Sequence, residues 1–527
     1  MNRNDMIARA RDANETWDLL IIGGGATGLG SAVDAASRGY RVLLVEQSDF
    51  AKATSSRATK IVHGGVRYLE QGNLSLVIGA LRERGRLLKN APHLVRNLEF
   101  IVPAYRWWEM PYYGFGLRMY DVLAGRLSFG RSRIISAAQA LERIPNLNAK
   151  HLRSGVLYHD GQFDDARLAT NLAQTAADHG ACLINYARVV RLLTANCRVL
   201  GAVVHDVETG DEFEVRARVV VNATGIFTDE IRRMDDFAAR PMVTPSRGIH
   251  IVLPHRFLAG STALMIPKTK DGRVLFGLPW HGAIVFGTTD TPADAPLLEP
   301  RPSREELEFL LEHAAIYLEK APQSSDVLST FAGLRPLVSN PNAKSTASIS
   351  RDHTIITSPS GLVTITGGKW TTYRKMAEDL VNHCVRVGGF ENKPCVTRTL
   401  SIHGAHDNAE QFGALSVYGA DAPGIQKLAD ETPALSERIH PDLPYIKAEV
   451  VWAARHEMAR TVEDALARRT RALLLNTRAS VATAPVVAEL MAAELGWDDA
   501  TKERNVNEYK ALAEGYLIET HLGGRQN

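Results

Sequence analysis

The chain has 527 residues, of which 45% are hydrophobic and 23% are charged, with a formal net charge of +2. This length predicts about two or three domains of a globular enzyme, and the near-neutral charge, without a continuous basic stripe, argues against a nucleic acid partner. The 4 cysteines show no CxxC or zinc-ligand spacing, so neither a disulfide scaffold nor a metal site is expected. No signal peptide or spanning helix is expected either, because no apolar run reaches about 18 residues.

The first organised unit is a short apolar run followed by a glycine loop. Leu19–Ile22 is typical of a strand buried on both faces, and Gly23-x-Gly25-x-x-Gly28 follows it before a small-residue helix. In such a unit the first glycine allows a tight turn, the second lets backbone approach a pyrophosphate, and the third lets the helix pack on the strand. A second apolar run ends at Glu46, 18 residues after Gly28, where an acid can bind ribose hydroxyls. The loop predicts a dinucleotide site without distinguishing FAD from NAD.

The next informative stretch, residues 53–70, is too polar and too interrupted by glycine to form a core segment. Its hydroxyl groups can face phosphate or flavin oxygens, and a histidine followed by two glycines lets the backbone pass close to a planar ring. A cation and a phenol stand side by side near its end. The candidate residues are Thr54, Ser55, Ser56, His63 and Gly64 for the cofactor, and Arg67 and Tyr68 for the substrate.

Two later turns follow buried strands and favour FAD over NAD. The first spans 222–225, and the second spans 366–369 and opens a helix. Either turn alone could be an ordinary strand–helix connection. Together with the position of the glycine loop ahead of any substrate domain they favour FAD, because a late helix N-terminus can lie against a flavin ring. The candidate cofactor residues in these turns are Thr224, Gly225, Gly367 and Gly368.

The order of expected strands and helices indicates an α/β fold in three parts. A Rossmann-like FAD-binding domain is expected from 15–75, 161–225 and 345–395, an inserted sheet-based substrate domain from 76–160 and 226–344, and a helical C-terminal domain from 396–527. One long helix is predicted over 449–475, with Arg468–Arg471 as a solvated face. The polar segment before Trp17 is expected to be frayed.

Several stretches together carry a family resemblance. They are IIGGGATGLG, ATSSRATKIVHGGVRYLE, VVNATG, GTTD, GLRPL, SRDHTI and GGKWTTYRKMAE, in this order within residues 15–395. With them the chain resembles the FAD-dependent, aerobic-type glycerol-3-phosphate dehydrogenase family, and HEMARTVEDALARRTR at 456–471 resembles that family's helical cap. The resemblance implies FAD as cofactor and a D-amino-acid-oxidase-like fold. It also implies oxidation of sn-glycerol 3-phosphate to dihydroxyacetone phosphate, with hydride transfer from C2 to flavin N5 and electrons passed to membrane quinone.

A phosphate dianion requires several cations or N–H donors, and arginine suits it best. By the family's pattern, the substrate contacts are Arg67, Tyr68, Lys369 and Thr371. The same pattern places Arg335 beside the reacting carbinol, and Arg351, in a polar turn, is a further candidate for the phosphate. Any one of these arginines could instead form a structural ion pair.

Oxidation of the carbinol also requires the hydroxyl proton to leave. His250 alternates with apolar residues on an expected strand, so its side chain could face a pocket, although a core histidine would show the same pattern. Because arginine is a poor base, we expect His250 to take the proton and Arg335 to stabilise the alkoxide. His63 is expected to lie against the flavin, and Asp290 to bound the same pocket or to serve only in a turn.

Residues 103–120 contain two tryptophans, four tyrosines and one phenylalanine, with arginines around them. Aromatic side chains flanked by cations suit a lipid interface, and a buried aromatic cluster is the alternative. We expect a cytoplasmic enzyme, attached peripherally to the inner face of the cell membrane through this segment and passing electrons to quinone. The alternative is an oxidase that passes electrons to oxygen and releases hydrogen peroxide. A homodimer is left open.

Overall fold

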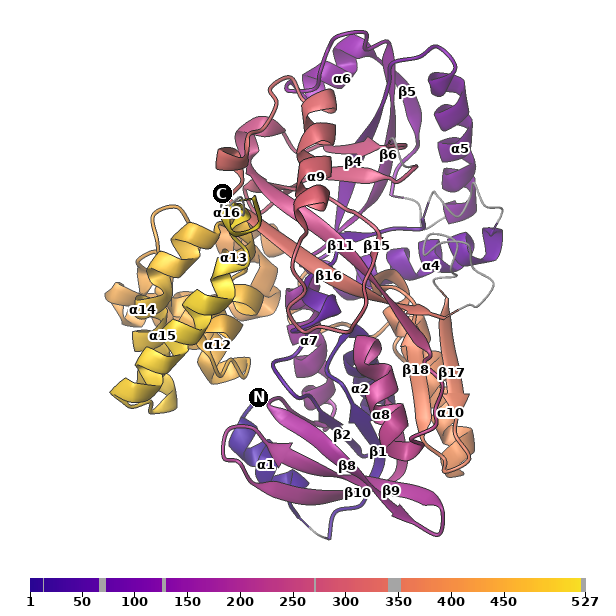
Figure 1. The fold of residues 1–527 in the computed structure, drawn as a ribbon, viewed down its shortest axis with the longest axis vertical. Helices are drawn as coiled ribbons and strands as arrows, with labels where there is room; N and C mark the ends of the chain where they lie inside the picture. Colours follow the sequence, from indigo (N-terminus) through magenta and orange to yellow (C-terminus); the bar gives the residue numbers. More distant parts are fainter. Residues whose placement is uncertain (13, 66–72, 126–128, 270–271, 340–351, 523–527) are drawn as a thin grey trace, which may run out of the picture.

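The computed structural model describes residues 1–527 except 13, 66–72, 126–128, 270–271, 340–351 and 523–527. Two sheets follow one another along the long axis of the molecule, and the helical C-terminal region packs beside them (Figure 1). Within the described ranges one sheet has 8 strands and the other 10.

The first sheet has a parallel centre, built from strands that read as apolar runs. Its main path is β17 (His353–Thr357), β18 (Val363–Gly367), β10 (Glu212–Asn222), β1 (Trp17–Ile22), β2 (Val42–Val45) and β7 (Cys182–Ile184). β1 pairs in parallel with both β2 and β10. Parallel strands need apolar side chains on both faces because helices cover both, and accordingly every residue of β2 is buried.

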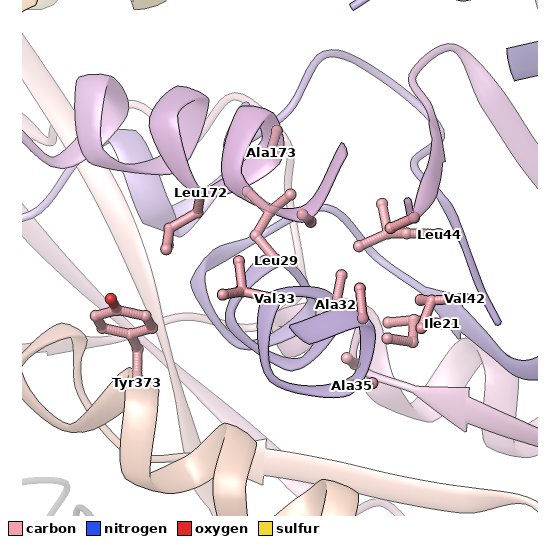
Figure 2. Packing of buried hydrophobic residues seen from close by; sticks show 14 of the residues in the cluster. Ile21, Leu29, Ala32, Val33, Ala35, Val42, Leu44, Leu172, Ala173 and Tyr373 are labelled. Atoms are coloured by element: carbon pink, nitrogen blue, oxygen red, sulfur yellow. The ribbon is translucent and has the colours of Figure 1, made fainter. Parts of the chain in front are cut away.

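Small residues let helix α2 pack closely against the other helices that cover the first sheet. α2 (Ala26–Ser37) lies against α7 (Asp165–Asp178) and α10 (Tyr373–Gly388), and Figure 2 shows Leu29 and Val33 of α2 among side chains of both neighbours. A Cβ at Gly30 would lie 2.7 Å from the Tyr373 ring. A Cβ at Gly28 would collide with the carbonyl oxygen of Gly23, so the third glycine of the loop serves helix–strand packing.

One strand is longer than the sequence indicates. The sequence predicts one strand at 213–218 and another buried strand in 218–225, but β10 is continuous from Glu212 to Asn222. Its first half pairs antiparallel with β9 (Arg198–Asp206) and its second half pairs in parallel with β1. β8 (Ala187–Ala195) extends the hairpin layer. Burial alternates in the first half and is continuous in the second, because only the second half has cover on both faces.

The second sheet is mostly antiparallel and carries the far side of the site. Its strands are β3 (Ile61–Val62), β4 (Arg96–Ala104), β5 (Arg133–Ser136), β6 (Ser154–Gln162), β11 (Val243–Pro254), β12 (Ala263–Ile266), β13 (Leu275–Trp280), β14 (Ala283–Gly287), β15 (Thr291–Pro292) and β16 (Ser329–Val338). β3 comes from the 15–75 segment yet pairs with β6. Helices α4 (Leu74–Asn90), α5 (Glu109–Ala124), α6 (Ala137–Arg143) and α9 (Arg304–Tyr317) surround this sheet (Figure 1).

The C-terminal region is helical, but its expected long helix is broken. In place of one helix over 449–475 the chain forms α12 (Lys447–His456), a π-helical turn η10 (Asp464–Arg469) and α13 (Ala472–Leu475). Met458 and Arg471 both have positive φ, which ends regular helix. The Asp464 carboxylate accepts from the backbone N–H groups of Arg460 and Thr461 and so starts the new turn. α14 (Thr477–Leu495), α15 (Asp499–Glu514) and α16 (Ile518–Leu522) follow.

Two expectations about polar segments are wrong. The segment before Trp17 is not frayed: α1 (Arg3–Ala10) is capped by the Asn2 side chain, and buried Arg3 donates to Asp206 over 2.7 Å. Arg468–Arg471 is not a solvated face, since all three of its arginines are buried.

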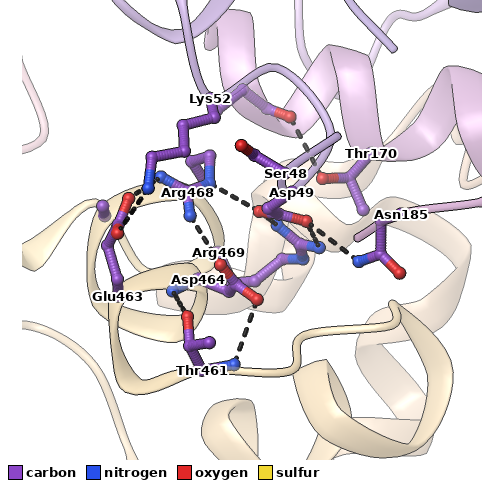
Figure 3. A network of polar contacts seen from close by, with 12 residues as sticks. Ser48, Asp49, Lys52, Thr170, Asn185, Thr461, Glu463, Asp464, Arg468 and Arg469 are labelled. Carbon is purple, nitrogen blue, oxygen red and sulfur yellow. Dashed lines mark hydrogen bonds and ion pairs between the residues drawn. The ribbon is translucent and has the colours of Figure 1, made fainter. Parts of the chain in front are cut away.

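Buried ion pairs join the C-terminal region to the loop after β2. Arg468 Nε and Arg469 Nη1 lie 2.5 and 2.9 Å from Asp49 Oδ2 (Figure 3). Lys52 reaches Glu463 over 2.9 Å. Although burial opposes it, the charges of Arg469 and Arg468 lower the pKa of Asp49 to about 2. Local sequence misses this seam of ion pairs because Asp49, the partner that Arg468 and Arg469 share, lies over 400 residues away along the chain.

Candidate active site

A cavity of about 410 Å³ lies where the two sheets meet. Its wall takes the glycine turn after β1 and the turn after β10 from the first sheet, and residues of β11 and β16 from the second. Both sets of predicted residues therefore face one space.

The glycine turn closes one end of this cavity. Gly23 has φ +111°, and a Cβ there would lie 2.7 Å from the carbonyl oxygen of Ala223. Gly25 is the N-cap of α2, and the Ala26 N–H donates to Ser55 Oγ over 2.9 Å. The glycine turn and the N-terminus of α2, with the Ser55 hydroxyl beside it, thus line this end of the cavity, the arrangement typical of a pyrophosphate site.

Glu46 lines the same end from the tip of β2. Its carboxylate accepts from the Gly24 N–H over 2.6 Å and from the Ser48 N–H over 3.0 Å. Burial raises the pKa of Glu46, and these two hydrogen bonds oppose that shift. The acid is therefore fixed beside the glycine turn, in reach of a ribose bound there.

The remaining predicted cofactor residues divide into two groups. Those that line the cavity are Thr54, Ser55, His63, Thr224, Gly225, Gly367 and Gly368. Ser56 and Gly64 are buried outside the lining: the Ser56 carbonyl accepts from Lys60, and the Gly64 N–H donates to the Tyr120 hydroxyl over 2.6 Å.

The predicted substrate residues are only partly described. Lys369 and Thr371 line the cavity, and Thr371 Oγ1 accepts from the His63 N–H over 3.1 Å, which brings two separate motifs together. Arg67, Tyr68 and Arg351 lie outside the described residues, so their roles stay predictions.

His250 stands on β11 with its imidazole buried. The ring stacks on Phe331, with centroids 4.7 Å apart, and Nε2 lies 3.1 Å from Thr59 Oγ1. Burial holds the pKa of His250 well below its usual range, and the charges of Lys60 and Arg335 add to this. The imidazole is therefore neutral near pH 7, as a proton acceptor must be.

Arg335 reaches the same space from β16. Its Nη2 donates to Thr288 Oγ1 and to the Thr289 carbonyl, each over 3.1 Å, and its Nη1 lies 3.6 Å from Asp290. A Cβ at Gly248 would collide with this guanidinium, so the glycine on the neighbouring strand makes room for it. Asp290 is thus the ion-pair partner of Arg335.

Two further residues of the wall have no distinguishing signal in the sequence. Thr59 and Trp370 both line the cavity, and the Trp370 indole N–H donates to the Ser55 carbonyl over 2.9 Å. Each lies inside a stretch that the family resemblance includes. Among several hydroxyls and aromatics in those stretches, only the fold shows which ones face inward.

A glycine turn at the head of a parallel βαβ unit, sharing a cavity with a neutral histidine and an arginine on a second sheet, defines an FAD-dependent oxidoreductase. A family model described as "FAD dependent oxidoreductase" matches residues 18–374, and one described as "C-terminal domain of alpha-glycerophosphate oxidase" matches 363–502. The expected fold class and the FAD cofactor are confirmed.

Known relatives show to which family of FAD-dependent oxidoreductases the chain belongs. The mitochondrial glycerol-3-phosphate dehydrogenase SDP6 of Arabidopsis thaliana is 42% identical over 96% of this chain and 87% of its own length. The mitochondrial enzyme of Homo sapiens is 42% identical over 93% of this chain and 72% of its own length. The structure of glycerol-3-phosphate dehydrogenase from Bacillus halodurans complexed with FAD has a TM-score of 0.79 at 28% identity, covering 98% of this chain and 97% of that one. The chain belongs to the FAD-dependent glycerol-3-phosphate dehydrogenase family.

Proposed function

We propose that this enzyme oxidises sn-glycerol 3-phosphate to dihydroxyacetone phosphate and passes the electrons to a membrane quinone. The observation that carries the proposal is that the glycine turn, His250 and Arg335 all line one cavity. Relatives 42% identical to the chain bear the name of this activity. FAD, when bound, supplies the acceptor for the hydride from C2; the protein supplies position, charge and a base.

The two groups of the second sheet divide the work on the carbinol. His250 is neutral because it is buried beside two cations, so it can take the hydroxyl proton. The guanidinium of Arg335 carries a permanent charge, and its bonds to Thr288 and Asp290 fix its direction. It stabilises the negative charge that develops on the oxygen. Lys369 and Thr371 are proposed to hold the phosphate, together with Arg67, Tyr68 and Arg351.

Flavin reduction under anaerobic conditions tests the reaction. Mixing the FAD-loaded enzyme with glycerol 3-phosphate should bleach the flavin absorbance, and Arg335→Ala should slow this step by about 100-fold to 1000-fold. Arg455→Ala, which breaks an ion pair with Glu494 on the surface, is the control and should match wild type. A flavin that glycerol 3-phosphate does not bleach contradicts the reaction, and an unchanged rate in Arg335→Ala removes that residue from the site.

The acceptor is tested by reoxidation. A short-chain quinone should reoxidise the reduced enzyme much faster than air-saturated buffer does. Rapid formation of hydrogen peroxide in buffer without quinone would instead establish an oxidase.

Quinone reduction requires a way to the bilayer, and α5 offers one. No helix among the described residues is long and apolar enough to cross a membrane. One side of α5 and the turn before it nevertheless expose apolar side chains: Trp107 is 74% exposed, Phe115 is 73% exposed, and Trp108, Tyr112, Met119 and Val122 are also exposed. Arg106, Arg118, Arg131 and Arg133 are exposed nearby in the sequence. The alternative of a buried aromatic cluster is therefore wrong for this face.

The other side of α5 reaches the cavity wall. Tyr120 is buried; its hydroxyl donates to Asp160 over 2.9 Å and accepts from the Gly64 N–H, next to His63. The helix lies at the outer edge of the molecule (Figure 1). We propose that the exposed face of α5 rests on the cytoplasmic surface of the cell membrane, where its aromatics enter the headgroup region and its arginines meet anionic lipid.

Vesicle flotation tests this surface. Wild type should float with vesicles of phosphatidylethanolamine and phosphatidylglycerol, and Trp107→Ala/Phe115→Ala should float several-fold less. Phe237→Ala is the matched control, because Phe237 is an aromatic that is 92% exposed on a different segment. Equal flotation of all three proteins would remove α5 from the proposal.

A further inference from the structure

Resting on the proposed function, we infer that the Thr59 hydroxyl is a catalytic proton relay between the substrate carbinol and His250. Thr59 and His250 both line the cavity, but Thr59 is half-buried, whereas His250 is only 2% exposed. The distance from Thr59 Oγ1 to His250 Nε2 is 3.1 Å. The hydroxyl is therefore the more accessible of the two hydrogen-bonded groups on the cavity wall.

The two ring nitrogens of His250 have different surroundings. Among the residues that the structure describes, Nδ1 is buried and has no hydrogen-bond partner. One face of the ring is covered by Phe331, and Cδ2 packs against Gly287, where a Cβ would have no room. Nε2 is the remaining polar atom, and Thr59 is its partner. This hydrogen bond is the path that we assign to the proton on its way to His250.

The relay balances without any further reactant. The carbinol proton passes to Thr59 Oγ1 while the Thr59 hydroxyl proton passes to the lone pair of Nε2. Thr59 ends as a neutral hydroxyl and His250 as an imidazolium. The hydride leaves C2 for the bound cofactor, as the proposed function states. Burial and the charges of Lys60 and Arg335 hold the pKa of His250 low, so the ring starts neutral, and the relay uses the tautomer with its proton on Nδ1 and the lone pair on Nε2.

The residues directly before and after Thr59 are both bonded to Asp165. The N–H of Ala58 donates to Asp165 Oδ2 over 2.8 Å, and Lys60 Nζ lies 2.8 Å from both oxygens of the same carboxylate. Arg471, from the C-terminal region, also donates to Asp165 over 2.9 Å and to the Ser56 carbonyl over 2.8 Å. A loop tied at the residues before and after Thr59 keeps the hydroxyl in one place, as proton transfer over a short distance requires.

Three substitutions of Thr59 separate the hydroxyl from the shape of the side chain. Thr59→Val keeps the shape and should slow anaerobic flavin reduction by about 100-fold. Thr59→Ser restores a hydroxyl and should stay within a few-fold of wild type. Thr59→Ala is the second variant without a hydroxyl, in case valine prevents cofactor loading. Thr483→Val, which removes a buried hydroxyl bonded to the Ile439 carbonyl in the helical region, is the control and should match wild type.

Binding is measured apart from turnover. The flavin absorbance change on adding dihydroxyacetone phosphate gives a dissociation constant, which should change by less than a few-fold in every variant, because Thr59 acts on the proton. Reduction of Thr59→Val and Thr59→Ala at the wild-type rate would overturn the relay, as would a Thr59→Ser enzyme as slow as Thr59→Ala. Failure of glycerol 3-phosphate to reduce wild type would contradict the proposed function instead.

Discussion

Two regions of this molecule reverse the usual distribution of side chains, in opposite directions. α5 and the turn before it expose phenylalanine and tryptophan, whereas Arg468 and Arg469 of η10 and Arg471, directly before α13, are buried. An exposed apolar face on a soluble surface marks a contact surface. Buried arginines are stable only with carboxylates beside them, and Asp49, Glu457 and Asp165 supply those. We propose that the exposed apolar face serves membrane association, whereas the buried ion pairs hold the C-terminal region to the rest of the fold.

Breaking the buried seam should have the largest effect. Asp49→Ala leaves Arg468 and Arg469 buried without their shared partner, so we expect the free energy of unfolding to fall by about 3–5 kcal/mol. Chemical denaturation of the FAD-loaded protein measures this. Arg455→Ala breaks an exposed pair with Glu494 and should cost less than about 1 kcal/mol. An equal loss of unfolding free energy in Asp49→Ala and Arg455→Ala would contradict the expectation that the buried ion pairs contribute more than the exposed one.

The two faces of α5 should respond differently to truncation. Leu117 is 3% exposed and packs in the core of the second sheet, so Leu117→Ala should cost about 2–5 kcal/mol. Phe115, two residues earlier, is 73% exposed, and Phe115→Ala should change stability by no more than about 0.5 kcal/mol. Thermal unfolding of both variants gives the comparison. A large loss for Phe115→Ala would show that its ring is covered in solution.

The smallest expected effect concerns pH. His403 connects Asp178 of α7 with Asp421 of the C-terminal region, at 2.7 and 3.1 Å. The hydrogen bond with Asp421, followed by that with Asp178, raises the pKa of His403 to about 9. Because the pKa of His403 is higher in the folded state, the charged imidazole stabilises the fold fully at pH values below 6.5, its pKa in the unfolded chain. This stabilisation is lost as the pH rises through about 9. Because His403 is partly exposed, we expect its charged form to contribute about 1–2 kcal/mol to the free energy of unfolding.

Denaturation of wild type and His403→Gln at several pH values measures this contribution. By the linkage relation, the difference in free energy of unfolding between the two proteins should be largest near about pH 6 and should shrink toward about pH 9.5. A difference that does not change with pH would contradict the charged state of His403.

The sequence alone was enough where structure is local. The glycine loop, the strand before it and Glu46 lie within 28 consecutive residues, and they form the unit that their spacing predicts. Arg335 and His250 reach the cavity as their motifs indicate. The arginine seam was missed because a charged run is solvated unless a distant carboxylate meets it. The Thr59 hydroxyl looked equivalent to those of its neighbours until β11 was placed behind it.

The ties around Asp165 have a consequence for unfolding. This one carboxylate receives donors from the loop after β2, from α7 and from Arg471 near the end of the charged seam. Helix, loop and C-terminal region therefore cannot separate without breaking the same set of bonds. Calorimetry should show the C-terminal region and the first sheet melting in a single transition, with cofactor release in that same step.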